Sequence, residues 1–409
     1  MKNYKILVIP SDNSGCGKFR SVDPHLALMK LDSEHFDIDI KSPMEVFAHS
    51  HEFPTFLEPY DLIHIHKQMD GDGVFIQMCL YLGKKVVVDI DDHYDLGLFH
   101  PMSRTAKEEH WADKIVTHLR YATCVTTTTE LFKKTLLKHN KNVVVLPNAV
   151  NPDEPQFKPV DNPSSKLRVG IICGSSHMED LKLLQGMISQ FSKEELDRLQ
   201  FVLCGFDLRG NNITIRPDGT KTLRPLLPTE TCWFHYERIM TDDYKITSPQ
   251  YTQFLHAFIP NAEYPLVSQE SYRRCWTKSI DTYATHYNNI DVLLAPLHDN
   301  EFNKSKSQLK VIEAGFFHKA IIASNIGPYT IDLKHAVDRN NNILKDGNAL
   351  LVDSNKNRKN WSKYIKLLLN DRNLLHTLQE NLYQTVKDKY NWLTVAEERR
   401  KLYLKLLED

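Results

Sequence analysis

Short apolar runs separated by helix-like segments constrain this chain most, because they recur in two successive series. In the first series, the runs Ile6–Pro10, Leu62–Ile65, Lys85–Ile90, Cys124–Thr127 and Val143–Leu146 have the composition of strands. Strands that are apolar throughout are typical of parallel sheets covered by helices on both faces. The first series therefore predicts a doubly wound parallel α/β sheet.

A second series of the same kind follows later in the chain. Its predicted strands are Arg168–Cys173, Phe201–Cys204, Val292–Leu297, Ala320–Ser324 and Ala349–Val352. A chain of 409 residues is long for one core, so two domains are expected. The predicted division is a first α/β domain at 1–150, a proline-rich linker at 151–166, a second α/β domain at 167–385 and a C-terminal helix at 386–409. Residues 208–227 are polar and rich in glycine and proline, which predicts an irregular excursion.

Composition narrows the classes of function. The formal net charge is −1, which gives no global electrostatic attraction for nucleic acid or an anionic membrane. A local basic stretch from Lys133 to Lys141 alternates with apolar residues, so weak association with a membrane surface remains open beside a solvated helix face. The seven cysteines are scattered and no Cys-x-x-Cys pair suggests zinc, so we expect reduced thiols and a cytoplasmic protein, peripheral at the inner face of the membrane at most. No signal peptide is recognised and no apolar run approaches the length of a membrane span.

Residues 302–315 carry the strongest functional signal. They place Ser305, Lys306, Ser307 and Glu313 on a predicted helix after an apolar strand. Backbone N–H groups near the two serines would meet a diphosphate at the helix N-terminus, and Lys306 would add positive charge. Glu313 lies about 10 Å further along, where its carboxylate could accept hydrogen bonds from ribose hydroxyls. A solvated helix face is the alternative interpretation of the same pattern.

The segment resembles the donor-binding signature of the retaining GT-B glycosyltransferases, of the glycogen-synthase-like family-four type. In that family a helix ending in Glu-Ala-Gly holds the donor nucleoside, and this chain has Glu313-Ala314-Gly315. Residues 145–151, Val-Leu-Pro-Asn-Ala-Val-Asn, resemble the end of the family's N-terminal domain. Family members commonly carry a second glutamate eight residues before the first, where this chain has Ser305.

The resemblance implies the GT-B architecture: two Rossmann-like domains that face a cleft, with the last helix crossing back to the first domain. The first domain would select the acceptor and the second would bind the nucleotide-sugar donor. Lys306 and Ser307 would stabilise the departing diphosphate, and no metal or other cofactor would be required.

A loop after the first strand, residues 11–20, contains Gly15 and Gly17, which would let the backbone approach a donor closely. Lys18 or Arg20 could then meet the donor phosphates or the acceptor. The loop lacks a Walker A motif, because Asp12 and Phe19 stand where glycine and Ser or Thr are needed. A plain tight turn with a surface Lys and Arg is the competing interpretation.

Four carboxylates crowd the end of the strand Lys85–Ile90, at Asp89, Asp91, Asp92 and Asp95. Such crowding is costly unless the groups are solvated, paired or used. We expect Asp91, Asp92 and His93 to orient the acceptor hydroxyl or the donor sugar. A metal site built on the Asp-Ile-Asp triplet and a helix-capping role are the alternatives.

In the second half, Cys173-Gly174-Ser175-Ser176-His177 is a strand followed by a glycine turn. By the resemblance, Gly174, Ser175 and His177 lie beside the donor diphosphate. Arg273, shortly before the donor strand, suits a bidentate phosphate contact, although adjacent arginines are commonly divided between solvent and an ion pair.

Taken with these features, the resemblance implies a metal-independent retaining glycosyltransferase. It would move a hexose-type sugar from a nucleotide-diphosphate sugar, such as a UDP- or GDP-sugar, to a hydroxyl on a glycan, lipid-linked or protein acceptor. A nucleic acid acceptor is disfavoured but not excluded by the charge. A GT-B-fold nucleotide-sugar epimerase and a non-catalytic subunit that binds donor or glycan are the alternatives.

Overall fold

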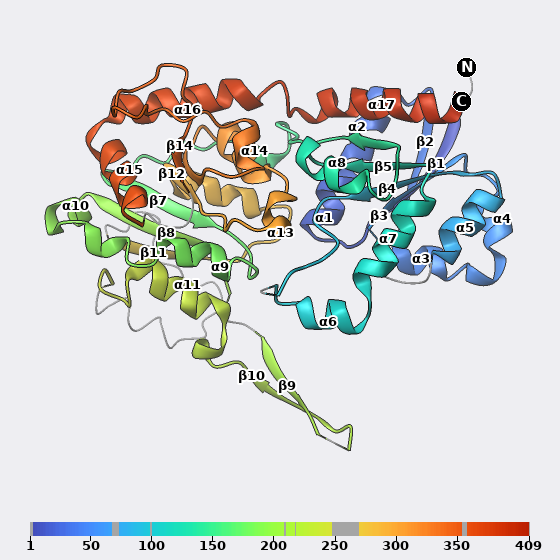
Figure 1. Ribbon diagram of the computed structural model, residues 1–409, viewed down its shortest axis with the longest axis horizontal. Helices are drawn as coiled ribbons and strands as arrows, with labels where there is room; N and C mark the ends of the chain where they lie inside the picture. The colour runs from blue at the N-terminus through green and yellow to red at the C-terminus, as the bar shows by residue number, and fades with distance from the viewer. Residues whose placement is uncertain are drawn as a thin grey trace. The chain divides into compact units, whose positions relative to one another are not determined.

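The computed structural model describes residues 3–67, 73–98, 100–207, 210–216, 218–247, 270–353 and 358–408 (Figure 1). The chain forms two compact units, and each is described by itself. The first unit consists of Met1–Pro152, Asn300–Ile312 and Thr385–Asp409. The second consists of Asp153–Asp299 and Glu313–Gln384.

The first unit is built on a six-stranded sheet in which every pairing is parallel. The strand order is β2-β1-β3-β4-β5-β6. The strands are β1 (Tyr4–Ile9), β2 (Phe36–Ile40), β3 (Leu62–His66), β4 (Lys85–Ile90), β5 (Cys124–Thr127) and β6 (Val143–Val145). The order reverses between β1 and β3, so ligands are expected at the carboxyl ends of these two strands.

Helices cover both faces of this sheet, which explains why its strands are apolar throughout. One face packs with residues of α5, α7 and α8, and the other with residues of α2 and α17. The helices of the unit are α1 (Gly15–Gly17), α2 (Asp23–Leu31), α3 (Pro43–Phe47), α4 (Phe53–Leu57), α5 (Val74–Tyr81), α6 (Ser103–Glu108), α7 (Trp111–Tyr121), α8 (Glu130–Leu136), α13 (Glu301–Lys304) and α17 (Trp392–Glu408).

The C-terminal helix α17 lies along α2, the first long helix of the chain (Figure 1). A buried polar group joins them: His25 of α2 shares a 2.8 Å hydrogen bond with the hydroxyl of Tyr403. The same hydroxyl lies 3.0 Å from Nδ1 of His64 in β3. The last residues of the chain are therefore part of the first unit's core.

The second unit also has a six-stranded parallel sheet, in the order β11-β8-β7-β12-β13-β14. Its strands are β7 (Leu167–Ile172), β8 (Leu199–Phe206), β11 (Tyr272–Trp276), β12 (Val292–Ala295), β13 (Ala320–Ser324) and β14 (Leu350–Val352). The order reverses between β7 and β12. This is the doubly wound topology of Rossmann-like domains.

One face of the second sheet packs into a large apolar core with residues of α11, α15 and α16. The opposite face meets the segment around the 3-10 helix Tyr283–Asn289, where Gly170 approaches Ile290 so closely that a Cβ would lie 2.2 Å from its side chain. The α-helices of this unit are α9 (Met178–Leu181), α10 (Lys193–Asp197), α11 (Cys232–Thr241), α14 (Leu309–Phe316), α15 (Arg358–Asn370) and α16 (Arg372–Val386), of which α14 and α16 each cross a boundary between the units.

The predicted fold class, two doubly wound parallel α/β sheets, is confirmed. Two strands were missed because they carry charged residues: β2 alternates apolar side chains with Asp37 and Asp39, and β11 contains Arg273 and Arg274. The prediction of an irregular segment at 208–227 was wrong. Apart from positions 208, 209 and 217, which lie outside the described residues, it forms the hairpin β9 (Asn211–Ile215) and β10 (Lys221–Pro225), which projects from the second unit (Figure 1).

The structural units differ from the predicted boundaries in two places. Residues 300–312, expected in the second domain, group with the first unit because Ser307 and Gln308 hydrogen-bond to Asn148 and Tyr390. The expected linker belongs mostly to the second unit, where Gln156 is 2% exposed and donates to the carbonyl of Ile280. Among the described residues, every helix is too short or too polar to cross a bilayer.

Candidate active site

In the loop after β1, backbone N–H groups bind a carboxylate of the loop itself, that of Asp12. The carboxylate of Asp12 accepts hydrogen bonds from the backbone N–H groups of Ser14, at 2.7 Å, and Gly17, at 3.2 Å. A Cβ on Gly17 would lie 1.8 Å from the Asp12 carbonyl oxygen. Burial opposes the ionisation of Asp12, but hydrogen bonds from the hydroxyls of Ser11 and Ser14, followed by these two N–H groups, outweigh it and hold the pKa below its ordinary value. Gly15 and Gly17 were predicted to contact the donor, but the Gly17 N–H is bound by the carboxylate of Asp12.

Arg20 does not reach outward to a phosphate, as the sequence had suggested. It is 1% exposed and forms a bidentate ion pair with Asp89, at 2.9 and 2.7 Å. Its remaining nitrogen donates to the carbonyl of Leu146 and to the Asn148 side chain. Arg20 therefore ties the start of the chain to the ends of β4 and β6.

The carboxylates after β4 are paired with a lysine that sequence reasoning missed. Lys67, just after β3, lies 2.5 Å from an oxygen of Asp91 and 3.7 Å from one of Asp92. His66 completes the group, with Nε2 3.3 Å from Asp91 and Nδ1 2.8 Å from the hydroxyl of Ser11. Burial opposes the charge of Lys67, but the two carboxylates raise its pKa. Lys67 and His66 thus offset the cost of crowding acids at this strand end.

The position of Lys67 affects the alternative prediction that the Asp-Ile-Asp triplet binds a metal ion. Sγ of Cys16 and carboxylate oxygens of Asp91 and Asp92 lie within 4.8 Å of one another, a spacing that could hold a cation. The ammonium of Lys67 already pairs with both carboxylates. A metal ion would have to displace it.

His93 lies next to this group, in the loop after β4. Its Nδ1 accepts the backbone N–H of Asp95 at 3.0 Å, and its ring stacks on Tyr94 with a centroid separation of 4.5 Å. Burial lowers the pKa of His93. The imidazole is therefore held neutral, with Nδ1 occupied as an acceptor.

Lys306 belongs to the same unit as the acidic strand end. Its ammonium lies 5.2 Å from the centre of the Phe302 ring, whose other neighbour is the imidazole of His100, at 5.5 Å. Burial lowers the pKa of His100, and the charge of Lys306 lowers it further, whereas Asp92 acts in the opposite direction. Two of the predicted catalytic groups, Lys306 and Asp92, thus both lie within electrostatic range of His100.

Residues 302–315 do not form one helix, so the single-helix prediction was wrong. Helix α13 ends at Lys304, and α14 begins at Leu309. Between them, Ser305 is buried and donates its hydroxyl to the carbonyl of Glu301 at 3.0 Å, and Ser307 accepts from Asn148 at 3.0 Å. These side-chain bonds fix the connection in place of helical ones.

Glu313 is not on a solvated face, because residues 311–316 of α14 are all buried. The carboxyl group of Glu313 is 3% exposed and accepts hydrogen bonds from the hydroxyls of Tyr283 and Tyr287, the latter at 2.8 Å. Burial, followed by the charge of Glu313, raises the pKa of both tyrosines, which keeps them protonated as donors. The two tyrosines therefore fix the orientation of the Glu313 carboxylate.

At the reversal point of the second sheet, the turn after β7 and the end of β12 are joined by one carboxylate. Asp180 lies 2.7 Å from Nδ1 of His177 and accepts the backbone N–H of His298 at 2.8 Å. The hydroxyl of Tyr236 donates to the Ser175 carbonyl and accepts from the His177 N–H, both at 2.8 Å. A Cβ on Gly174 would meet nothing within 4 Å. These bonds therefore hold the turn rigid, and the space beside Gly174 is open.

Arg273 is in a different environment from the one predicted. It is 1% exposed within β11 and donates to the Asn289 side chain at 3.2 Å. The neighbouring Arg274 forms a buried ion pair with Glu237 at 3.1 Å. Both arginines thus have structural partners in the interior of the second unit.

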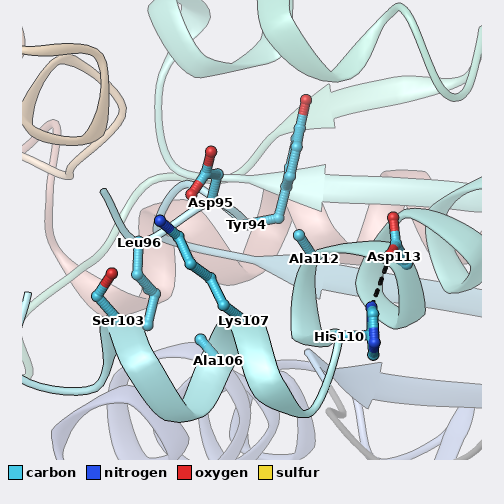
Figure 2. Close-up of a pocket in the computed structure, with 9 residues that line it drawn as sticks. All are labelled: Tyr94, Asp95, Leu96, Ser103, Ala106, Lys107, His110, Ala112 and Asp113. Carbon is cyan, nitrogen blue, oxygen red and sulfur yellow. Dashed lines mark ion pairs between the residues drawn. The ribbon is translucent and has the colours of Figure 1, made fainter. Parts of the chain in front are cut away.

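A cavity of about 230 Å³ lies beside the loop after β4 (Figure 2). Its walls come from that loop and from α6 and α7, including Tyr94, Asp95, Lys107 and the ion-paired His110 and Asp113. Pockets for drug-sized ligands measure about 300–1,000 Å³. This cavity is thus smaller than a nucleotide sugar requires.

No family model matches the sequence, and no curated protein matches it. Solved structures match over the whole chain. A glycosyltransferase from Rickettsia africae aligns with a TM-score of 0.63 at 13% identity, covering 100% of both chains. HepE from Anabaena, solved with UDP, aligns at 0.60 and 12%, covering 99% of this chain and 100% of that one. The catalytic domain of starch synthase IV from Arabidopsis thaliana, bound to ADP and acarbose, aligns at 0.58 and 13%, covering 100% of both.

These identities are too low to transfer an activity, but the agreement extends from end to end of each chain. Both sheets of the present chain are parallel, six-stranded and wound on both faces. In fold, this chain is similar to the GT-B glycosyltransferases.

Proposed function

We propose that this protein is a glycosyltransferase that moves a hexose-type sugar from a nucleotide-diphosphate sugar to a hydroxyl acceptor, with retention and without a metal. The observation that carries the proposal is the charged group of the first unit. There Asp92 follows the carboxyl end of β4, and the ammonium of Lys306 lies 5.2 Å from the Phe302 ring, which packs 5.5 Å from His100 of the same loop. Ligands bind at such strand ends in doubly wound sheets.

The chemistry assigned to Lys306 is electrostatic. When the bond between the sugar and the diphosphate breaks, negative charge grows on the leaving oxygen and positive charge on the sugar. A fixed ammonium, held near the Phe302 ring, stabilises the departing diphosphate more than the intact donor. The start of α14, immediately after Ser307 and Gln308, adds the favourable end of a helix dipole.

Asp92 is the carboxylate assigned to the acceptor. Asp91 is bound closely by Lys67 and its side chain is 10% exposed, whereas the Asp92 side chain is 32% exposed and lies further from the ammonium. Asp92 can therefore accept a hydrogen bond from an incoming hydroxyl. His93, neutral and fixed against Tyr94, positions the same loop.

Glu313 is assigned to the donor nucleoside. Tyr283 and Tyr287 fix its carboxylate, so its orientation is set before a ribose arrives. Nucleotide recognition of this kind is supported by the similar structures, since HepE was solved with UDP and glucose and starch synthase IV with ADP. Ser305 holds the helix connection in place of the family's usual glutamate.

The test starts with a thermal-shift screen of nucleotide sugars, because a ligand that binds the native state raises its stability. With the best donor and a panel of hydroxyl acceptors, Lys306→Ala should lower kcat by about 10² to 10³-fold with a small change in donor affinity. The matched control is Lys304→Ala, which removes a more exposed lysine of the same segment. Equal activity of the two variants would refute the role of Lys306.

Three further conditions separate the alternatives. Full activity in chelator is expected for a metal-independent enzyme. Donor incubated without acceptor should not give an epimerised sugar, and finding one would identify an epimerase instead. Donor binding without transfer or hydrolysis over the whole panel would indicate a non-catalytic subunit.

A further inference from the structure

Three buried side chains in the second unit form a cluster that the proposed reaction does not use. Cys204 of β8, Cys275 of β11 and His286 of the 3-10 helix are 0%, 0% and 1% exposed. Cys204 and Cys275 are register partners on neighbouring parallel strands, so both side chains lie on one face of the sheet. The two sulfur atoms and a ring nitrogen of His286 lie within 4.8 Å of one another. Residues far apart in the sequence thus converge on one point.

His286 is the unusual member of this cluster. Neither of its ring nitrogens has a hydrogen-bond partner among the described residues, although the imidazole is buried. His25 in the first unit is equally buried, but its two nitrogens bond to the Ser21 carbonyl and the Tyr403 hydroxyl. Burying a polar group without a partner costs free energy, commonly about 1–3 kcal/mol. A group that accepts the lone pair of His286 would remove that cost.

We propose that Cys204, Cys275 and His286 bind one soft divalent metal ion, with zinc as the best fit. Two sulfurs and one imidazole nitrogen are the donor set that zinc prefers. Two thiolates balance the charge of the ion, and the two thiol protons are released on binding.

The geometry needs only a small contraction. Zinc–sulfur bonds of about 2.3 Å in a tetrahedral arrangement separate two sulfurs by roughly 3.8 Å. The observed limit of 4.8 Å therefore requires movement of about 1 Å at most. Three protein ligands leave a fourth position for a water molecule.

Such an ion would join three elements of the second unit. It would link β11, the edge strand of the sheet, to β8 and to the 3-10 helix. That helix also carries Tyr283 and Tyr287, which hold Glu313. The metal would thus stabilise the helix that holds Glu313, the residue assigned to the nucleotide, and would take no part in the reaction.

The experiment uses the full chain, purified under reducing conditions and dialysed against metal-free buffer. Metal analysis should find about one zinc per chain, as expected for a buried thiolate site. Replacement by Co²⁺ should give a thiolate-to-cobalt charge-transfer band in the near ultraviolet. Cys275→Ser and His286→Asn should reduce the metal content at least tenfold. Cys79→Ser, which alters a buried free cysteine of the first unit, should leave it unchanged.

Several results would overturn the proposal. One is a wild-type chain that contains no metal after growth with zinc and shows no cobalt band. Another is a disulfide between Cys204 and Cys275 in the purified protein, found by mass spectrometry. A third is full metal content in both variants, which would place the ion elsewhere. The wild-type cobalt spectrum decides the question by itself if the variants do not fold.

Discussion

Replacing Arg20 by methionine should destabilise the first unit strongly. Arg20 and Asp89 are 1% and 0% exposed, and Arg20 makes four hydrogen bonds. In the variant the Asp89 carboxylate stays buried but loses the charge of the guanidinium. It keeps the hydrogen bond from Thr126, and His66 lies further away. Breaking a buried ion pair costs about 3–5 kcal/mol. In a domain of about 150–250 residues, this corresponds to a fall in Tm of roughly 6 to 20 °C.

The assay is thermal and urea unfolding, followed by hydrogen exchange of β4 to assign the transition to the first unit. Arg104→Met is the control, because Arg104 pairs with Glu108 on the surface with its side chain 89% exposed. Its unfolding midpoints should stay close to those of the wild type, because exposed ion pairs contribute little to stability. The double variant Arg20→Met/Asp89→Asn should recover much of the loss by removing both charges. A loss below about 1 kcal/mol in Arg20→Met, equal to the control, would refute the reasoning.

Other expectations concern pH and backbone packing. Burial holds the pKa values of His25 and His64 well below the ordinary 6.5. The unfolded chain therefore takes up protons that the folded one does not, and stability should fall as the pH drops below about 6.5, by up to about 1.4 kcal/mol per pH unit for each histidine. Urea midpoints between pH 7.5 and 5.5 measure this slope, which should be smaller in His64→Gln; an unchanged slope would contradict it. Gly17→Ala should cost about 1–3 kcal/mol, because its Cβ would lie 1.8 Å from the Asp12 carbonyl oxygen. Gly174→Ala, where a Cβ meets nothing, is its control, and equal midpoints for the two would show that the loop relaxes freely.

The sheets were predictable because most of their strands are apolar on both faces, and a single sequence is enough to show that pattern. Two of the four edge strands, β2 and β11, were not. In β11, Arg273 and Arg274 look like surface residues, and only the folded chain brings Asn289 and Glu237 to them. Their burial depends on partners 16 and 37 residues away.

The same limit applies to the site. Lys306 and Asp92 were identified from residue type and position, but Lys67 was not, because its pairing with Asp91 follows from the adjacency of β3 and β4. Helical periodicity predicted that Glu313 lies on a polar face. It could not reveal that a second layer, Tyr283 and Tyr287, covers that face. Nor could spacing show that the carboxylate of Asp12 would bind the N–H groups of Ser14 and Gly17.

The position of α17 has a consequence for how the protein is made. Tyr403 bonds to His25 and His64, which precede it by 378 and 339 residues. A ribosome adding about 5–20 residues per second would finish the first sheet's strands tens of seconds before α17 emerges. During that interval the sheet face that later receives Leu402, Tyr403 and Leu406 is exposed, since these residues belong to its core. The first half of the chain is therefore translated first, but its core is completed only when α17 emerges. We expect this half to have the greatest need of a chaperone during synthesis.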